Sequence, residues 1–503
     1  VQSYQKRGLD VLRWLAQRAD ESGRTVNVRL VKGAYWDAEI KRAQERGLPG
    51  YPVFTRKPST DVSFLACARF LLQGTARLYP QFASHNAHTV AWVMQVARET
   101  GRHFEFQRLH GMGEELYSAV TRADGLAVPC RVYAPVGEHE DLLPYLVRRL
   151  LENGANTSFV NRIVNENEPI EAVVADPVQT VDALGQAAHP RIPLPVDIYR
   201  PERRNSSGLQ LADGAVLAEL AERMQRVSRR PWLAGPMVSG KELDGPSQPV
   251  RNPANTAEVV GTVRTAAPAQ VEAAVAAAAR AQSDWNDAGA ETRAAALERA
   301  ADLFESNLHE LVAMCVREAG KTVPDSIAEV REAVDFLRYY ATQTDQPHPA
   351  RGVFACISPW NFPLAIFTGQ VSAALAAGNC VLAKPADQTP AIAALAVKTL
   401  HRAGIPRAAL QLVPGKGSVV GARLTSDPRI DGVALTGSTE TARRINRALA
   451  ARDAPLAAFI AETGGQNAMI VDSSALPEQV VKDVIRSAFH SAGQRCSALR
   501  VLF

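Results

Sequence analysis

Short apolar runs alternate with amphipathic stretches over about the first 160 residues, and this alternation limits the chain to folds that mix strands with helices. The runs with the length of buried strands are Val26–Val31, Leu78–Ala83, Phe104–Leu109 and Cys130–Ala134. Apolar residues recur at helical spacing in Leu9–Ala19, Val62–Leu72, Val90–Glu99 and Leu142–Leu151. Because strands separated by helices usually pair in parallel, the pattern predicts a β/α arrangement.

Polar residues directly follow these strands, at Lys32-Gly33, Ser84-His85-Asn86 and Gln107. A β/α barrel places its chemistry at the carboxyl ends of its strands. With Val1–Tyr4 as the end of one more strand, the sequence contains five strand-helix units, whereas a closed barrel has eight. We therefore expect a partial barrel made of the C-terminal five units, with the first three absent from the chain.

The amino-acid composition of the sequence changes after residue 165. Residues 166–249 are rich in proline around one predicted helix, Ala215–Arg226, and this composition is typical of a connector. From Val250 onward, predicted helices and strands alternate in a doubly wound α/β pattern. The helices are Pro268–Ala281 and Glu291–Ala319, and the strands are Val353–Ile357, Cys380–Ala383, Ala409–Val413 and Gly432–Leu435. The predicted regions are thus 1–165, 166–249 and 250–503.

The composition, the charge balance and the cysteine spacing exclude several classes of protein. The 503 residues are 46% hydrophobic and carry 56 basic against 52 acidic side chains, a balance too even for a general nucleic-acid or membrane surface. The six cysteines are scattered without close spacing, which predicts neither a disulfide framework nor a metal site. With no leader and no apolar run of spanning length, we expect a cytoplasmic enzyme.

Two motifs near the C-terminus pair a candidate base with a candidate nucleophile: Glu462-Thr463-Gly464-Gly465 and Gly493-Gln494-Arg495-Cys496. A cysteine attacks a carbonyl as its thiolate, and a carboxylate can activate the water that releases the acyl group. Asn361, in Ser358-Pro359-Trp360-Asn361-Phe362-Pro363, offers an amide for the developing oxyanion. Taken singly, each motif also fits a structural role, since cysteines are commonly buried and Glu462-Thr463-Gly464 fits a helix cap and turn.

With Lys384-Pro385-Ala386 and Thr436-Gly437-Ser438 between them, these motifs occur in an order that resembles the aldehyde dehydrogenase superfamily over residues 250–503. The resemblance implies that Cys496 is the nucleophile, Glu462 the base and Asn361 the oxyanion donor. Asp387 stands where the family more often has Glu. The implied contacts to NAD come from Ser358, Trp360, Lys384, Asp387, Gly417, Gly421, Thr436, Gly437 and Ser438.

The first 165 residues carry motifs that closely resemble proline dehydrogenase: Arg29–Trp36, Tyr51–Lys57, Ser84-His85-Asn86 and Tyr145–Asn156. Two adjacent guanidinium groups, Arg148 and Arg149, can grip a small carboxylate, although an Arg-Arg pair on a helix also fits a solvated face. The resemblance implies that this carboxylate is L-proline, with Tyr133 and Tyr35 beside the ring. It places Arg29 near the reactive nitrogen of FAD. The other implied FAD contacts are Gln2, Val31, Lys32, Gly33, Trp36, Thr55, Lys57, Ser84 and His85.

Together, the two resemblances point to the bifunctional proline utilization flavoproteins. They imply FAD-dependent oxidation of L-proline to 1-pyrroline-5-carboxylate, then NAD-dependent oxidation of glutamate-γ-semialdehyde through a cysteine thiohemiacetal. A quinone or other electron acceptor, peripheral association with the inner membrane and a homo-oligomeric full-length parent are further expectations. Because we expect truncation at both ends, the alternatives are a catalytically incomplete fragment or a DNA-binding regulator, and no basic arm for nucleic acid is present.

Overall fold

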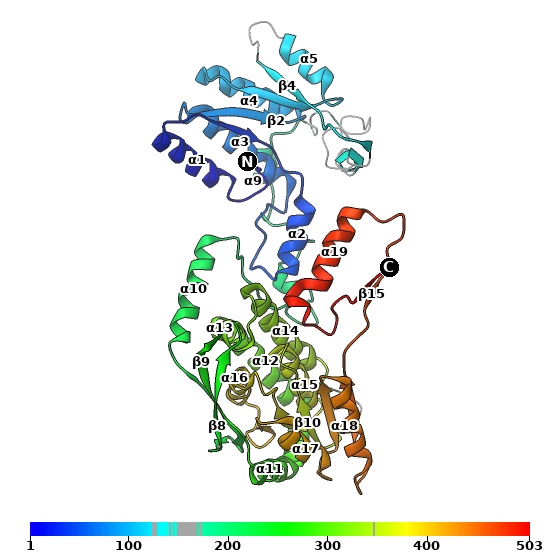
Figure 1. The fold of residues 1–503 in the computed structure, drawn as a ribbon. Helices are drawn as coiled ribbons and strands as arrows, with labels where there is room; N and C mark the ends of the chain where they lie inside the picture. Colours follow the sequence, from blue (N-terminus) through cyan, green and yellow to red (C-terminus); the bar gives the residue numbers. More distant parts are fainter. Residues whose placement is uncertain are drawn as a thin grey trace. The chain divides into compact units, whose positions relative to one another are not determined.

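A computed structural model describes residues 1–503 apart from 123–127, 140–141, 144, 148–168, 170, 172–173 and 346–347. The chain divides into two compact units (Figure 1). The first contains Val1–Glu45 and Pro49–Pro195, and the second contains Arg46–Leu48 and Val196–Phe503. The sequence predicted as a connector, 166–249, therefore contributes to both units.

The first unit contains a parallel sheet in the order β1-β2-β3-β4. Its strands are β1 (Val26–Leu30), β2 (Leu78–Ala83), β3 (Glu105–Leu109) and β4 (Cys130–Tyr133), each within about a residue of its predicted bounds. The further strand predicted at Val1–Tyr4 is present only as a bridge, in which Gln2 pairs in parallel with Val31. Of the helix predicted at Leu142–Leu151, residues 144 and 148–151 lie outside the described residues.

The described helices of the first unit are α1 (Gly8–Ser22), α2 (Trp36–Glu45), α3 (Lys57–Gln73), α4 (Ala87–Thr100), α5 (Glu114–Arg122) and α9 (Pro177–Asp182). Buried residues of α1, α3, α4 and α5 share one hydrophobic core with the strands. Because strand side chains alternate between faces, Phe82 and Phe106 join the buried core with Phe64 of α3. The neighbouring residues Gln81, Glu105 and Gln107 point to the other face, which is polar.

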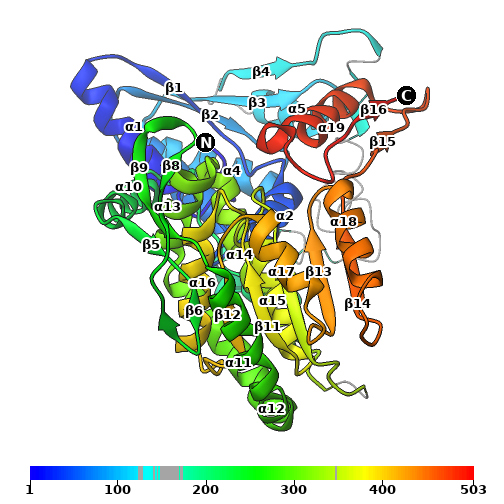
Figure 2. The same cartoon turned by 60° about the horizontal axis from the view of Figure 1, so that its bottom comes forward.

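The second unit contains a sheet in the order β14-β13-β10-β11-β12-β6-β7, most of which can be followed across Figure 2. The central strands are parallel: β10 (Val353–Ile357), β11 (Cys380–Lys384), β12 (Leu410–Leu412), β13 (Gly432–Thr436) and β14 (Ala458–Glu462). The chain runs outward from β10 to β12 and then returns to the other side of β10 with β13. This reversal is the doubly wound topology that the sequence predicts, and it opens a ligand-binding position between β10 and β13.

Short strands in the proline-rich stretch escaped the sequence-based prediction. β6 (Met237–Val238) and β7 (Lys241–Glu242) extend the large sheet. A separate sheet, β5-β9-β8, contains β5 (Trp232–Ala234), β8 (Ser247–Asn252) and β9 (Asn255–Arg264). Single strands of two or three residues carry too little hydrophobic periodicity to detect. Two further short strands, β15 (Ala468–Met469) and β16 (Val501–Leu502), pair near the C-terminus.

The helix predicted at Glu291–Ala319 is two helices, α12 (Ala290–Ser306) and α13 (Leu308–Ala319). Asn307, with φ −96° and ψ 15°, leaves the helical conformation between them. Gly320 ends α13 at φ +67°, and the Thr322 hydroxyl caps the next helix, so Gly320-Lys321-Thr322 is a turn between helices. The remaining helices are α10 (Gly214–Ser228), α11 (Pro268–Asp287), α14 (Val323–Ala341), α15 (Ala365–Ala376), α16 (Pro390–Arg402), α17 (Ala422–Ser426), α18 (Thr439–Ala450) and α19 (Pro477–Phe489).

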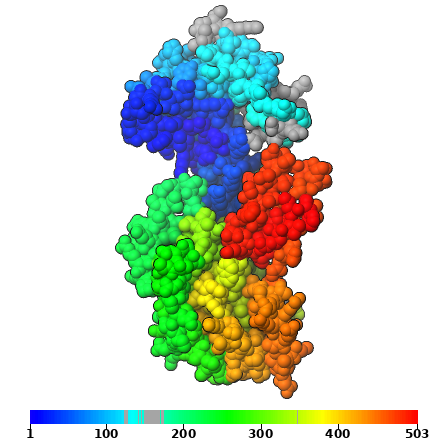
Figure 3. Space-filling model, viewed as in Figure 1, coloured from blue at the N-terminus to red at the C-terminus, as the bar shows by residue number. Residues whose placement is uncertain are grey.

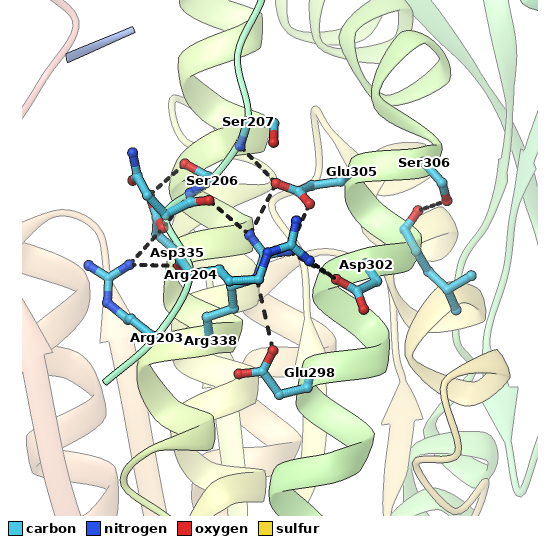
Figure 4. A network of polar contacts seen from close by, with 12 residues as sticks. Arg203, Arg204, Ser206, Ser207, Glu298, Asp302, Glu305, Ser306, Asp335 and Arg338 are labelled. Carbon is cyan, nitrogen blue, oxygen red and sulfur yellow. Dashed lines mark hydrogen bonds and ion pairs between the residues drawn. The ribbon is translucent and has the colours of Figure 1, made fainter. Parts of the chain in front are cut away.

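A buried arginine joins α12 to α14 (Figure 4). Arg338 has no exposed surface, and its Nη2 donates to Glu305 Oε2 at 2.7 Å and to Asp302 Oδ1 at 3.0 Å. Glu305 also accepts the backbone N–H of Ser207 at 2.7 Å. Ser206 Oγ donates to Asp335 on α14 at 2.6 Å. The network thus fixes both helices and the segment that precedes α10.

Candidate active sites

The residues implied to contact NAD gather at one edge of the second unit's sheet. Ser358, Trp360 and Asn361 follow β10, while Lys384 ends β11 and Asp387 lies just beyond it. Thr436 ends β13 and is followed by Gly437 and Ser438, and Gly417 and Gly421 follow β12. Because the carboxyl ends of parallel strands meet at one edge, the topology brings these separate motifs together.

Lys384 is buried at this edge with two partners for its ammonium group. Its Nζ donates to Pro385 O at 2.8 Å and forms an ion pair with Asp387 Oδ1 at 3.1 Å. The backbone N–H of Ser358 donates to Lys384 O at 3.2 Å, which links the loops after β10 and β11. The shorter Asp387, in place of the more common Glu, therefore contacts the neighbouring lysine.

The start of α18 forms a second part of the candidate NAD site at this edge of the sheet. Ser438 caps the helix, since its Oγ accepts the backbone N–H of Thr441 at 3.1 Å. The N-terminus of a helix carries partial positive charge and free N–H groups, which suit a phosphate. Gln370 on α15 donates to Thr436 Oγ1 at 2.9 Å, and Gly437 N–H donates to Glu462 O at 3.0 Å. This last bond sets the end of β14, with its exposed Glu462, beside Gly437.

Cys496 is exposed, on a segment that reaches the surface in red in Figure 3. The Asn361 amide donates to Gln494 O at 2.9 Å, and the Asn467 amide donates to Cys496 O at 2.6 Å. The first of these contacts joins the Asn361 amide to a residue that precedes Cys496 by two positions in the sequence. By contrast, Cys356 is buried, and this raises the pKa of its thiol to about 12. The buried-cysteine alternative therefore does not describe Cys496.

A cavity of about 430 Å³ lies next to Asn361. Its wall includes Lys321 and Asp325 near the start of α14, together with Trp360, His490 and Gln494. His490 Nε2 lies 2.8 Å from Oδ1 of the buried Asp325 carboxylate. The cavity thus adjoins the segment that carries Cys496.

In the first unit, Arg29 lies on the polar face of the sheet. Its Nε donates to Gln107 Oε1 at 2.8 Å and its Nη2 donates to the Tyr133 hydroxyl at 3.1 Å. Gln107 in turn donates to Glu105 at 2.8 Å, and Arg131 binds the same carboxylate through Nε at 2.9 Å. Hydrogen bonding from Arg131 lowers the pKa of Glu105. The structure therefore adds Glu105 and Arg131 to the surroundings of Arg29 and Tyr133, as the alternation of polar residues in β3 and β4 could have suggested, and it places Gln107 within β3 and not directly after it.

The Asp61 carboxylate pairs with two of the candidate FAD residues. Asp61 itself was not among the residues that the sequence predicted to contact FAD. Lys32 Nζ pairs with Asp61 Oδ1 at 2.5 Å, and Lys57 Nζ pairs with Oδ2 at 2.6 Å. Burial lowers the pKa of Lys32, and the Asp61 carboxylate offsets part of that effect. Gly33 has φ +130°, and a Cβ there would lie 2.6 Å from the Tyr4 ring. Glycine is thus required at this strand end.

The remaining candidates occupy separate positions around the first sheet. Trp36 Nε1 donates to Phe54 O at 2.8 Å, and Thr55 Oγ1 accepts the backbone N–H of His189 at 3.0 Å. Ser84 and His85 follow β2, and Tyr35, at the start of α2, is exposed. Gln2 and Val31 form the bridge described above. Arg148 and Arg149 lie outside the described residues.

In the part of the chain that the structure describes, no helix combines the length and the hydrophobicity needed to span a bilayer. Within the same residues, no group of three or more histidine, cysteine or carboxylate side chains is arranged to hold a metal ion.

Comparison with protein families assigns both halves of the chain. Residues 1–162 match the proline dehydrogenase family, and residues 241–503 match the aldehyde dehydrogenase family. The whole chain is 56% identical to the bifunctional protein PutA of Klebsiella aerogenes, of which it covers 40%. About half of the chain (49%) is 39% identical to 1-pyrroline-5-carboxylate dehydrogenase of Bacillus cytotoxicus, of which it covers 52%.

A solved structure gives the same result. All of the chain superimposes on half (50%) of a variant of Bradyrhizobium japonicum proline utilization A, with a TM-score of 0.87 and 50% identity. The chain spans about 40% of the length of the curated PutA relatives that it matches. It therefore belongs to the aldehyde dehydrogenase family, joined to a proline dehydrogenase region in the arrangement of the bifunctional PutA proteins.

Proposed function

We propose that the protein containing this chain oxidises L-proline to L-glutamate in two steps. The first step is FAD-dependent oxidation of proline to 1-pyrroline-5-carboxylate, and the second is NAD-dependent oxidation of glutamate-γ-semialdehyde. The observation that carries the proposal is the contact between the Asn361 amide and Gln494, two residues before an exposed Cys496, in a chain that also matches proline dehydrogenase.

In the second step, the Cys496 thiolate adds to the aldehyde carbon to form a thiohemiacetal. The Asn361 side-chain amide and the Cys496 backbone N–H stabilise the developing oxyanion, a contribution worth about 3 kcal/mol for one donor. When bound, NAD would supply the acceptor for the substrate hydride. Glu462 then activates the water that releases glutamate from the thioester.

The second unit fits NAD because its candidate residues share the carboxyl edge beside the β10–β13 reversal. Ser358, Trp360, Lys384 and Asp387 are proposed to contact NAD from the loops after β10 and β11. The phosphates are proposed to lie near Gly437 and Ser438 at the start of α18. Thr436, Gly417 and Gly421 complete the proposed set.

In the first step, Arg148 and Arg149 are proposed to bind the proline carboxylate, with Tyr133 and Tyr35 beside the ring. When bound, FAD would supply the acceptor for the proline hydride. The donor set fits a flavin: Arg29 presents a guanidinium oriented by Gln107 and Tyr133, and Gly33 leaves the strand end without a side chain. The remaining FAD contacts are proposed to come from Gln2, Val31, Lys32, Trp36, Thr55, Lys57, Ser84 and His85.

The proposal also covers the electron acceptor, the cellular location and the oligomeric state. The reduced flavin needs an electron acceptor, which we propose is a quinone reached at the membrane surface. The full-length protein is proposed to be cytoplasmic, peripheral to the inner membrane and homo-oligomeric.

Replacing Cys496 with Ala tests the assignment of two separate sites. In a chain extended to the length of its PutA relatives, C496A should abolish NADH formation from the semialdehyde, because no thiohemiacetal can form. Reduction of the flavin by proline should continue at the unsubstituted rate. Stopped-flow absorbance of the flavin and of NADH measures both reactions, and loss of both in folded C496A would contradict two independent sites.

A further inference from the structure

A buried carboxylate caps the helix that follows the Asn361 loop. Glu329, on α14, is 2% exposed. Its Oε1 accepts the backbone N–H groups of Leu364 at 3.0 Å and of Ala365 at 2.8 Å. Ala365 begins α15, so these N–H groups belong to the helix terminus, where the partial charge is positive. Glu329 thereby fixes the backbone three and four residues after Asn361.

The second oxygen of Glu329 pairs with Lys321. Nζ lies 3.1 Å from Glu329 Oε2, and the side chains are 6% and 1% exposed. The same ammonium group lies 4.7 Å from the centre of the Phe362 ring, directly after Asn361. The pair therefore contacts both Phe362 and the start of α15.

A buried ion pair is weak evidence for added stability, because taking two charges out of water offsets most of their attraction. Burial accordingly raises the pKa of Glu329, while Lys321 and the two backbone N–H groups act in the opposite direction. The contacts of Glu329 and Lys321 give this ion pair a different role, which is to fix the main chain next to the Asn361 side-chain amide. An oxyanion donor acts through its position before the reaction begins, so a small displacement of that amide reduces catalysis.

We propose that Glu329, together with Lys321, is a positioning residue for Asn361. This inference rests on the proposed dehydrogenase function for its catalytic consequence. Neither residue needs to touch the substrate for this purpose. Glu329 fixes the start of α15, Lys321 orients the Glu329 carboxylate and covers Phe362, and the intervening loop presents the Asn361 amide to the segment of Cys496.

The same unit contains a matched control. Glu318, on α13, is 2% exposed and accepts the backbone N–H groups of Ala391 at 2.7 Å and Ile392 at 2.8 Å, in the first turn of α16. It is a cap of the same kind, on a helix that does not follow the Asn361 loop. Comparing the two carboxylates separates positioning of Asn361 from a general loss of helix capping.

Hydrogen exchange in the present chain tests the positioning without any assumption about activity. E329A should speed exchange of the Leu364 and Ala365 amides by at least about tenfold and leave those of Ala391 and Ile392 unchanged. E318A should do the reverse. E329Q retains an acceptor oxygen and should keep Leu364 and Ala365 protected. Equal acceleration at all four amides in both variants would indicate global destabilisation and overturn the proposal.

Steady-state kinetics of the full-length protein, at saturating NAD, test the catalytic consequence. E329A should lower kcat for the aldehyde by about 10- to 100-fold with KM changed by less than about threefold, since the lost donor acts in the transition state. E329Q should recover most of that loss, and E318A should retain kcat within about twofold.

A double variant decides between positioning and a general structural effect. E329A/N361A should be no slower than N361A, because a residue that acts only through the amide has no effect once the amide is gone. Additive losses would overturn the proposal. An inactive unsubstituted protein would instead reject the proposed dehydrogenase function, and the exchange experiment would still decide whether Glu329 positions the loop.

Discussion

At the residue scale, Glu318 shows how burial and capping oppose each other in one carboxyl group. Burial raises its pKa to about 7, although two backbone N–H groups favour the charged form. The folded protein therefore holds this proton up to about pH 7, while the unfolded chain releases it near the ordinary glutamate value of 4.5. Between these limits the folded state binds more protons, so its stability must fall as the pH rises.

We predict that E318Q weakens this pH dependence, because the amide has no proton to release in that range. Between pH 5 and pH 8, the unsubstituted chain should lose about 2 kcal/mol more of its unfolding free energy than E318Q loses. Urea unfolding at the two pH values provides the measurement. Glu332, whose pKa burial also raises to about 7, contributes a slope of the same sign in both proteins. Parallel pH profiles for both proteins would count against a raised Glu318 pKa.

The sequence allows site residues to be predicted where they lie in short linear motifs, as Cys496, Glu462 and Asn361 do, and these three assignments stay predictions. Residues whose roles depend on tertiary contacts were not predicted. Glu329 lies 35 residues before Leu364, the backbone group that it caps, and nothing in its local sequence indicates that contact. Asp61 was missed for the same reason, since its role depends on two lysines from different segments.

At the scale of elements, hydrophobic periodicity predicted the long helices and buried strands well. β2 and β10 have their predicted bounds. The break at Asn307 was missed because apolar residues continue on both sides of it with helical spacing. The strands β5, β6 and β7 were missed because they have only two or three residues each, and such strands depend on their pairing partners more than on their own sequence. The neighbouring strands β8 and β9 were missed as well, although they have six and ten residues.

The buried contact between Arg338 on α14 and Glu305 on α12 leads to a prediction at the scale of elements. R338M should lower the free energy of unfolding by about 3–5 kcal/mol, because it leaves Glu305 largely buried without its cation. The double variant R338M/E305Q should lose less, since the carboxylates that remain, Asp302 and Glu298, are exposed to water. Chemical denaturation of each variant measures the losses. A double variant less stable than R338M would show that the charge of Glu305 has another stabilising partner.

At the scale of the whole molecule, each unit has its own hydrophobic core. We predict two transitions in scanning calorimetry, one for each unit. F82A removes a fully buried ring from the first unit, at a cost of about 3–5 kcal/mol, and should lower one transition only. R338M should lower the other. If each variant shifts both transitions together, the units unfold as one cooperative body.

The order of segments within the two units also restricts where this polypeptide can be divided. Arg46–Leu48 belong to the second unit although the residues on both sides of them belong to the first, and Gly47 O accepts the backbone N–H of Gly208 at 2.8 Å. If the gene were divided between codons 195 and 196, Arg46–Leu48 would be expressed with the first unit, although they belong to the second. Separately expressed halves would each carry a defect there, so the two pieces of sequence are not two interchangeable modules.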